Sequence, residues 1–118
     1  MDTKKMNMIC NLVKSISDGR MTLKEAKLEA EDEGINPNSF NDYYRAWSNM
    51  LNGTVHTRSI NSDLRDMMLR RIKSYFGIEA LLKALDAFEK SIQYYESKHN
   101  TQMNKDRSVL DSHRASNQ

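Results

Sequence analysis

The apolar residues of this chain recur at the spacing of an amphipathic α-helix along most of its length. The first such segment covers residues 2–17. Its apolar positions are Ile9, Leu12, Val13 and Ile16. The second segment covers residues 22–33 and starts with the sequence TLKE. This sequence fits a capping box, in which Thr22 bonds the amide of Glu25 and the Glu25 carboxylate reaches back. We predict one helix in each segment, the second ending at Gly34.

The strongest periodicity of the chain lies in residues 36–52. Asn36 is a good N-cap residue, and Pro37 suits the first helical position, where an amide hydrogen has no partner anyway. The apolar stripe that follows contains Phe40, Tyr43, Tyr44, Trp47, Met50 and Leu51. We predict a third helix that ends at Gly53 and turns its aromatic residues toward the core.

Two further helices are predicted in the second half of the chain. Residues 53–60 read as a loop or extended segment, and Asn61 or Ser62 then caps a helix that Gly77 ends. The inward residues expected in this helix are Leu64, Met67, Met68, Ile72, Tyr75 and Phe76. A fifth helix is expected from Ile78 to about Lys98. Its expected inward residues are Ile78, Leu81, Leu82, Leu85, Phe88, Ile92 and Tyr95.

From residue 99 onward the chain is polar, and its large apolar residues are Met103, Val109 and Leu110. Such a segment buries too little apolar surface to offset its ordering entropy, so we expect a mobile tail with at most a transient helix. The predicted fold is therefore all-α. It is a compact bundle of about five helices in a single domain at 1–98, with a helix-turn-helix-like corner at 22–52 and a flexible polar C-terminal tail at 99–118.

Composition agrees with this class and narrows the function. The 118 residues have the length of one domain, and four Gly and one Pro leave few helix breakers. The net charge of +2 is too small to indicate nucleic-acid binding by itself. The single cysteine, Cys10, cannot form an internal disulfide, and we expect it to be buried. No apolar stretch has the length of a signal peptide or membrane span, so we expect a cytoplasmic protein without a membrane partner.

No pattern typical of catalysis or cofactor binding occurs in the sequence. His56, His99 and His113 lie far apart, without cysteines or carboxylates at metal-ligand spacing. The glycines stand alone as helix ends and form no phosphate-binding loop. The acidic run at 31–33 reads as a solvated helix end and not as a cation site. We therefore expect a protein that is not an enzyme and needs neither a metal nor a small-molecule cofactor.

The second and third predicted helices have the residue pattern of a helix-turn-helix unit. Ala30 lets two helices cross closely, Gly34 supplies the positive φ of the turn, and Ile35, Phe40 and Tyr43 bury the second helix against the first. The outward side of that helix carries Asn36, Asn38, Asn41, Asp42, Arg45 and Asn49. Asparagine and arginine can read adenine and guanine edges with paired hydrogen bonds. The same corner also occurs in bundles that never contact DNA, and the preceding helix is acidic, which disfavours phosphates.

Residues 53–76 carry five basic side chains and two acidic ones, a net charge of +3. The basic residues are Arg58, Arg65, Arg70, Arg71 and Lys73. A basic patch beside the turn would supply the sequence-independent phosphate contacts of a DNA-binding protein. A solvated helix face with pairs such as Asp66–Arg70 explains the same residues equally well.

Three sequence stretches stand out beyond composition. They are MLNGTVHTR at 50–58, YFGIEAL at 75–81 and IQYYE at 92–96. Together with the GIN and SF positions at 34–40, they make the region from about residue 20 to residue 98 resemble the helical N-terminal region of some bacterial HNH-type restriction endonucleases. The HNH module with its His and Cys residues is absent, so the resemblance implies a DNA-associated accessory or recognition domain without nuclease activity. The resemblance implies that Arg58 contacts DNA. Tyr94, Tyr95 and Glu96 also match the family pattern, although helix packing explains the tyrosines equally well.

The sequence thus predicts a small non-catalytic DNA-associated protein of a restriction, regulatory or mobile-element system in a bacterium or phage, with double-stranded DNA as its partner. The candidate DNA contacts are Asn36, Asn38, Asn41, Arg45, Arg58, Arg65, Arg70, Arg71 and Lys73. The alternative is a protein–protein interaction module, either a homodimer or a domain that docks onto a partner nuclease or regulator through exposed Met or Tyr side chains.

Overall fold

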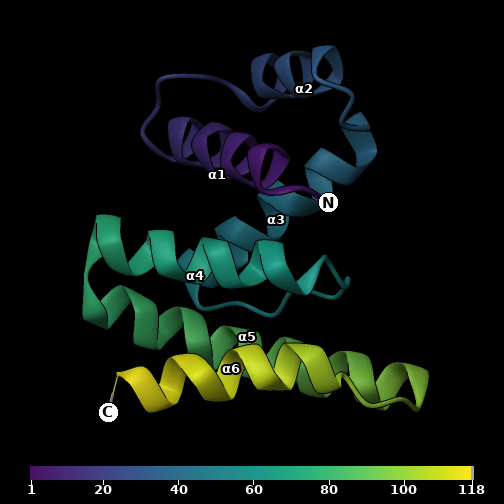
Figure 1. Cartoon of the computed structure of the whole chain (residues 1–118), viewed down its shortest axis with the longest axis vertical. Helices are drawn as coiled ribbons and strands as arrows, with labels where there is room; N and C mark the ends of the chain where they lie inside the picture. Colours follow the sequence, from purple (N-terminus) through teal and green to yellow (C-terminus); the bar gives the residue numbers. More distant parts are fainter. Residues whose placement is uncertain (118) are drawn as a thin grey trace.

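The computed structural model describes residues 1–117, and within them the chain forms six α-helices and no strand (Figure 1). The helices are α1 (Thr3–Ser17), α2 (Leu23–Asp32), α3 (Pro37–Asn52), α4 (Ser62–Phe76), α5 (Ile78–His99) and α6 (Asn104–Ser116). The all-α prediction is confirmed. The expected count of about five helices is corrected to six, because a helix also forms in the segment that we expected to be a tail.

The helices begin where local side-chain chemistry predicts. The Thr22 hydroxyl accepts from the Glu25 amide at 3.1 Å, and the Thr22 amide donates to the Glu25 carboxylate at 3.0 Å. This reciprocal capping box starts α2. Asn36 caps α3, and Asn61, not Ser62, caps α4. Each cap satisfies amide groups that have no partner inside the first helical turn.

The core contains buried side chains from each of the helices α1 to α6. Helix α5 packs against α3, α4 and α6, whereas α1 packs against α2, α3 and α4 (Figure 1). Trp47 and Phe40 of α3 and Phe88 of α5 are the largest buried side chains. The Trp47 indole donates to the Ser17 hydroxyl at 2.7 Å, so its polar group is satisfied inside the core. Cys10 is buried as predicted, and burial raises the pKa of its thiol to about 11. No helix among the described residues is both long and apolar enough to cross a membrane.

The corner between α2 and α3 is tight. Gly34 has a φ of +82°, and the Ile35 amide donates to the Ala30 carbonyl at 2.9 Å. Ala30, Ile35 and Phe40 are buried, so the two helices pack closely across the turn. Two packed helices of this kind occur both in DNA-binding units and in other helical bundles.

The segment after α5 is not a mobile tail but a turn followed by α6. Asn100 takes a left-handed conformation with φ of +50° and ends α5, after which the chain turns back and α6 packs on α4 and α5 (Figure 1). Leu110 enters the core and is 2% exposed. The sequence prediction underestimated this helix because most of its attachment is polar, and polar contacts leave no hydrophobic periodicity.

The polar attachment of α6 involves several ion pairs and hydrogen bonds. The Glu96 carboxylate accepts from both the Arg107 guanidinium and the Met103 amide. The Arg107 guanidinium is the main cause that lowers the pKa of Glu96, to about 2. The His113 imidazole lies 2.7 Å from the Asp66 carboxylate of α4. These contacts tie both ends of α6 to the bundle.

The junction of α4 and α5 corrects a second expectation. Tyr75, Phe76, Ile78 and Leu82 were predicted to face inward, but each is between 43% and 47% exposed. We call these four residues the apolar corner. Gly77, with φ of +94°, separates α4 from α5 at this point, so the inward stripes of the two helices stop before the corner. Leu69, which was not in the predicted stripe, is fully buried instead.

Candidate nucleic-acid interface

Helix α3 carries a row of polar side chains opposite its buried aromatic face. Its members are Asn38, Asn41, Asp42, Arg45 and Asn49, which we call the polar stripe. Asn38 and Arg45 are exposed, and the other three are half-buried. This separation follows from the helical period of 3.6 residues, because Phe40 and Trp47 occupy the opposite side of α3. The structure thus places three predicted contacts, Asn38, Asn41 and Arg45, on one solvent-accessible face.

Asn36 has a structural role that limits its use in recognition. Its side-chain oxygen accepts from the amides of Asn38 at 2.8 Å and Ser39 at 3.3 Å. The carboxamide is therefore oriented along the first turn of α3 as an N-cap. Paired hydrogen bonding to adenine needs both ends of a carboxamide, so Asn36 does not belong with the polar stripe.

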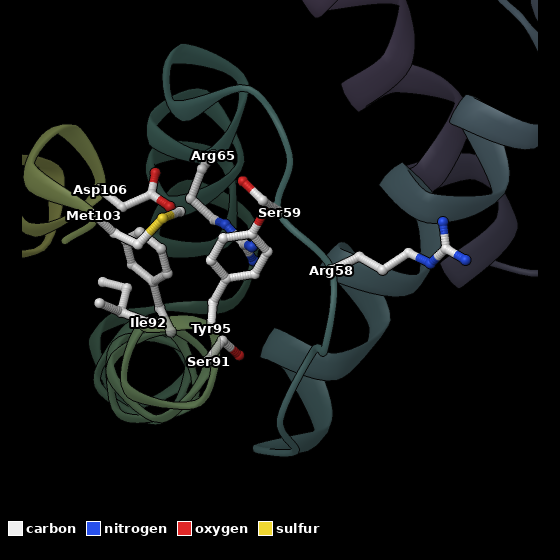
Figure 2. A pocket seen from close by; sticks show the side chains of 9 residues that line it. Arg58, Ser59, Arg65, Ser91, Ile92, Tyr95, Met103 and Asp106 are labelled. Carbon is white, nitrogen blue, oxygen red and sulfur yellow. The ribbon is translucent and has the colours of Figure 1, made fainter. Parts of the chain in front are cut away.

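Arg58 lies next to the polar stripe, although it comes from the extended linker 53–61 between α3 and α4. Its guanidinium lies 3.7 Å from the Asp42 carboxylate, and its side chain is 70% exposed. Figure 2 shows this side chain pointing away from the buried group around Arg65. The linker is held in place where the His56 amide donates to the Ser91 hydroxyl of α5 at 2.8 Å.

The other predicted basic residues do not join this surface. On a helix successive residues are rotated by about 100°, so the basic residues of α4 point in different directions. Arg71 donates to Asn7 and Asn11 of α1 at 2.7 and 2.9 Å. Arg70 pairs with Asp66 at 2.8 Å, and Lys73 bonds Asn117 near the end of α6. The expected basic patch is therefore divided among several faces of the molecule.

Arg65 requires a correction, because its side chain is buried and not at the surface. It is 2% exposed, and its guanidinium lies 4.8 Å from the centre of the Phe88 ring. Burial lowers the pKa of Arg65 to about 10, and the nearby Asp106 carboxylate opposes this shift. The guanidinium thus stays charged at neutral pH inside the fold. Its Nε and Nη1 have no hydrogen-bond partner within residues 1–117.

The burial of Arg65 has a signal in the sequence that the prediction did not use. The buried residues of α4 are Leu64, Arg65, Met68, Leu69 and Ile72. Arg65 stands four positions before Leu69 and directly follows Leu64, so it lies on a continuous inward stripe. An arginine on such a stripe needs an anionic or aromatic neighbour, and here Asp106 and Phe88 provide both.

His56 is buried beside Arg65 and is 4% exposed. Burial is the main cause that lowers the pKa of His56 to about 4, and the positive charge of Arg65 lowers it further. The imidazole is therefore neutral at pH 7. His56 therefore adds no positive charge to this surface.

Two surface features were not anticipated from the sequence. One is the apolar corner, and the other is an open groove between α3 and the C-terminal end of α5. The groove is lined by Asp42, Thr57, Arg58, Ser59, Tyr95 and His99. The described part of the chain contains no group of three or more His, Cys, Asp or Glu side chains able to hold a metal ion.

Comparison of this chain with protein-family models, with curated proteins and with solved structures finds no match.

Proposed function

We propose that this protein binds double-stranded DNA through the polar stripe of α3 and Arg58. The observation that carries the proposal is the clustering of Asn38, Asn41 and Arg45 on one accessible face of one helix, with Arg58 beside it. An α-helix fits the major groove, where asparagine reads adenine and arginine reads guanine. Arg58 then contacts phosphate, and the resemblance to the restriction-associated helical region selects the same residue.

Charge limits where DNA approaches. Helix α2 is acidic and packs against α3, so phosphates are repelled from that side. Asp42 lies inside the polar stripe and close to Arg58. This carboxylate weakens phosphate binding at the stripe, so its removal provides a sensitive test of where the DNA lies.

The test is a fluorescence-polarisation titration of duplex DNA at two salt concentrations. We expect Arg58→Ala to weaken binding to all sequences and to reduce the salt slope by about one. We expect Arg45→Ala to cost about 1–3 kcal/mol on preferred sequences. Asp42→Asn should strengthen binding because it removes a negative charge. Arg70→Ala is the matched control, since Arg70 is exposed on α4 at the side that faces α6.

Two results overturn the proposal. One is the absence of duplex binding at low salt. The other is an equal loss of affinity in Arg58→Ala and Arg70→Ala, which would indicate non-specific attraction to positive charge.

The apolar corner supports a second candidate function, docking onto another protein. Tyr75 and Phe76 contact each other, with ring centres 6.2 Å apart, and Ile78 and Leu82 extend this surface along α5. Exposed aromatic and aliphatic side chains that lie together are typical of protein interfaces. Light scattering of the wild-type protein and of Leu82→Lys tests self-association. A monomer that is unchanged by the substitution and captures no partner contradicts this second function.

A further inference from the structure

The groove between α3 and α5 is wide and open to solvent. Its volume is about 410 Å³, within the range of about 300–1,000 Å³ that is typical of small-molecule sites. Asp42 belongs both to the groove and to the polar stripe, so the two surfaces are continuous. The linker contributes Thr57, Arg58 and Ser59, and α5 contributes Tyr95 and His99.

The α5 side of the groove presents two aromatic rings in contact, tilted relative to each other. The ring centres of Tyr95 and His99 are 4.2 Å apart, and the ring planes are inclined by 36°. The two residues are one helical turn apart, which keeps the rings on the same side of α5. His99 is exposed and Tyr95 is half-buried, so the pair is both accessible and supported. Aromatic side chains with an accessible face are surfaces on which unpaired nucleobases stack.

A buried positive charge lies behind the groove. A small cavity of about 10 Å³ shares Arg58, Ser59 and Tyr95 with the groove lining, and Arg65 also lines it (Figure 2). Arg65 is only 2% exposed. Two of its guanidinium nitrogens have no hydrogen-bond partner among the described residues. The cavity volume suits one water molecule. A water molecule placed there would lie between the Arg65 guanidinium and the groove.

The charged groups around the groove favour an anion that also carries hydrogen-bond donors. Arg58 lies 3.7 Å from Asp42, which is beyond hydrogen-bond distance, so its guanidinium donors can turn to a phosphate. Asp42 and Asp106 carry the opposing charges, and Asp106 accepts from the Ser62 hydroxyl at 2.5 Å below the cavity. Asp42 remains available to accept from an amino group of a base.

We propose that this groove binds one nucleotide of an unpaired DNA or RNA strand. The base stacks on the Tyr95–His99 pair, Asp42 accepts from its amino group, and the phosphate is bound by Arg58 with water-mediated support from Arg65. Bases inside a duplex have both faces covered, so the groove selects unpaired nucleotides. This inference goes beyond the duplex binding proposed above, because it concerns a second surface and another form of nucleic acid.

The experiment compares three labelled ligands of one 15-nucleotide mixed sequence by fluorescence polarisation: the DNA strand, its duplex, and the RNA strand. We expect the unpaired strands to bind more tightly than the duplex. Tyr95→Ala and His99→Ala should weaken binding of the unpaired strand by about 5- to 100-fold, as expected for the loss of one stacked base. Tyr95→Phe keeps the ring and should bind within about twofold of the wild type.

The two ring variants keep the test valid if one of them is unstable. His99 is exposed, so its replacement should leave the far-UV circular dichroism and melting temperature unchanged. Preference for the DNA or the RNA strand distinguishes the two sources of unpaired nucleotide, and either preference supports the groove when strand binding also depends on the two rings.

The outcomes separate this inference from the duplex binding proposed above. If duplex binding depends on Arg45 and strand binding is unaffected by both ring variants, the groove assignment is overturned and the duplex function stands. Ring-dependent strand binding without any duplex binding supports the groove and overturns the duplex function. If neither ligand binds at low salt, both proposals are wrong.

Discussion

Replacing Leu110 by alanine measures how much α6 contributes to the fold. Leu110 is 2% exposed and belongs to the main core cluster, although most of its helix is polar. The substitution removes three carbon atoms, worth about 2.4 kcal/mol at about 0.8 kcal/mol per methylene group. The cavity left behind adds a further cost that depends on how far α6 can collapse onto α5.

We therefore expect the free energy of unfolding to fall by about 2.5–4 kcal/mol. For a chain of this length each kcal/mol corresponds to roughly 3–6 °C in melting temperature, so the midpoint should drop by about 10–20 °C. Urea titrations followed by circular dichroism and by Trp47 fluorescence provide the measurement. Trp47 lies in α3, so coincident curves from both probes indicate that α6 unfolds together with the bundle.

Ser108→Ala is the matched control on the same helix. Ser108 is exposed, so this substitution should change the stability by less than about 0.5 kcal/mol. If Leu110→Ala is as mild as Ser108→Ala, Leu110 does not stabilise the fold, and the reasoning that docks α6 on the core is wrong.

Three further predictions concern pH and the backbone. The folded-state pKa of Glu96 lies below its unfolded value of 4.5. The Glu96–Arg107 pair therefore contributes to the free energy of unfolding above about pH 4.5, and this contribution is lost as the pH falls toward 2. In urea titrations at several pH values, Glu96→Gln should remove this dependence. The pKa of His56 is lowered to about 4, so the free energy of unfolding should fall by up to about 3 kcal/mol as the pH decreases from 6.5 to 4. In an NMR titration, the His56 midpoint should lie at a higher pH in Arg65→Met than in the wild type. Gly34→Ala should cost about 1 kcal/mol in thermal unfolding through its φ of +82° alone, because no atom lies within 4 Å of the added Cβ.

Each of these three predictions has a contradicting result. Unchanged acid sensitivity in Glu96→Gln would mean that other carboxylates control the low-pH transition. A His56 midpoint near 6.5 would show that the imidazole is solvated. A neutral or stabilising Gly34→Ala would mean that the corner accepts a right-handed conformation.

The positions of the first five helices were readable from the sequence because their signals are local. Each signal involves only a few neighbouring residues. The signals are the capping box at Thr22, the Asn-Pro pair at the start of α3 and the isolated glycines at helix ends. The periodic stripe of α3 also predicted the burial of Phe40, Trp47 and Met50. The same periodicity separated the polar stripe from the core, so Asn38, Asn41 and Arg45 lie on the outward side of α3, as predicted.

Other features depended on contacts between distant parts of the chain. The inward stripe of α4 indicates that Arg65 is buried, but no spacing within α4 encodes its partners, Phe88 of α5 and Asp106 of α6. The apolar corner is exposed because the chain supplies no element to cover it among the described residues, although its helical period is regular.

By itself, then, the sequence determined the helical class, the helix ends and the two faces of α3, since hydrogen bonding and periodicity act within one segment. Only the tertiary structure decided that α6 docks, that the basic residues of α4 are divided among several faces, and that Tyr95 and His99 meet Arg58 in one groove. These outcomes depend on which side chains from separate helices come within a few ångströms of each other. Packing sets that proximity, and it has no counterpart in local sequence order.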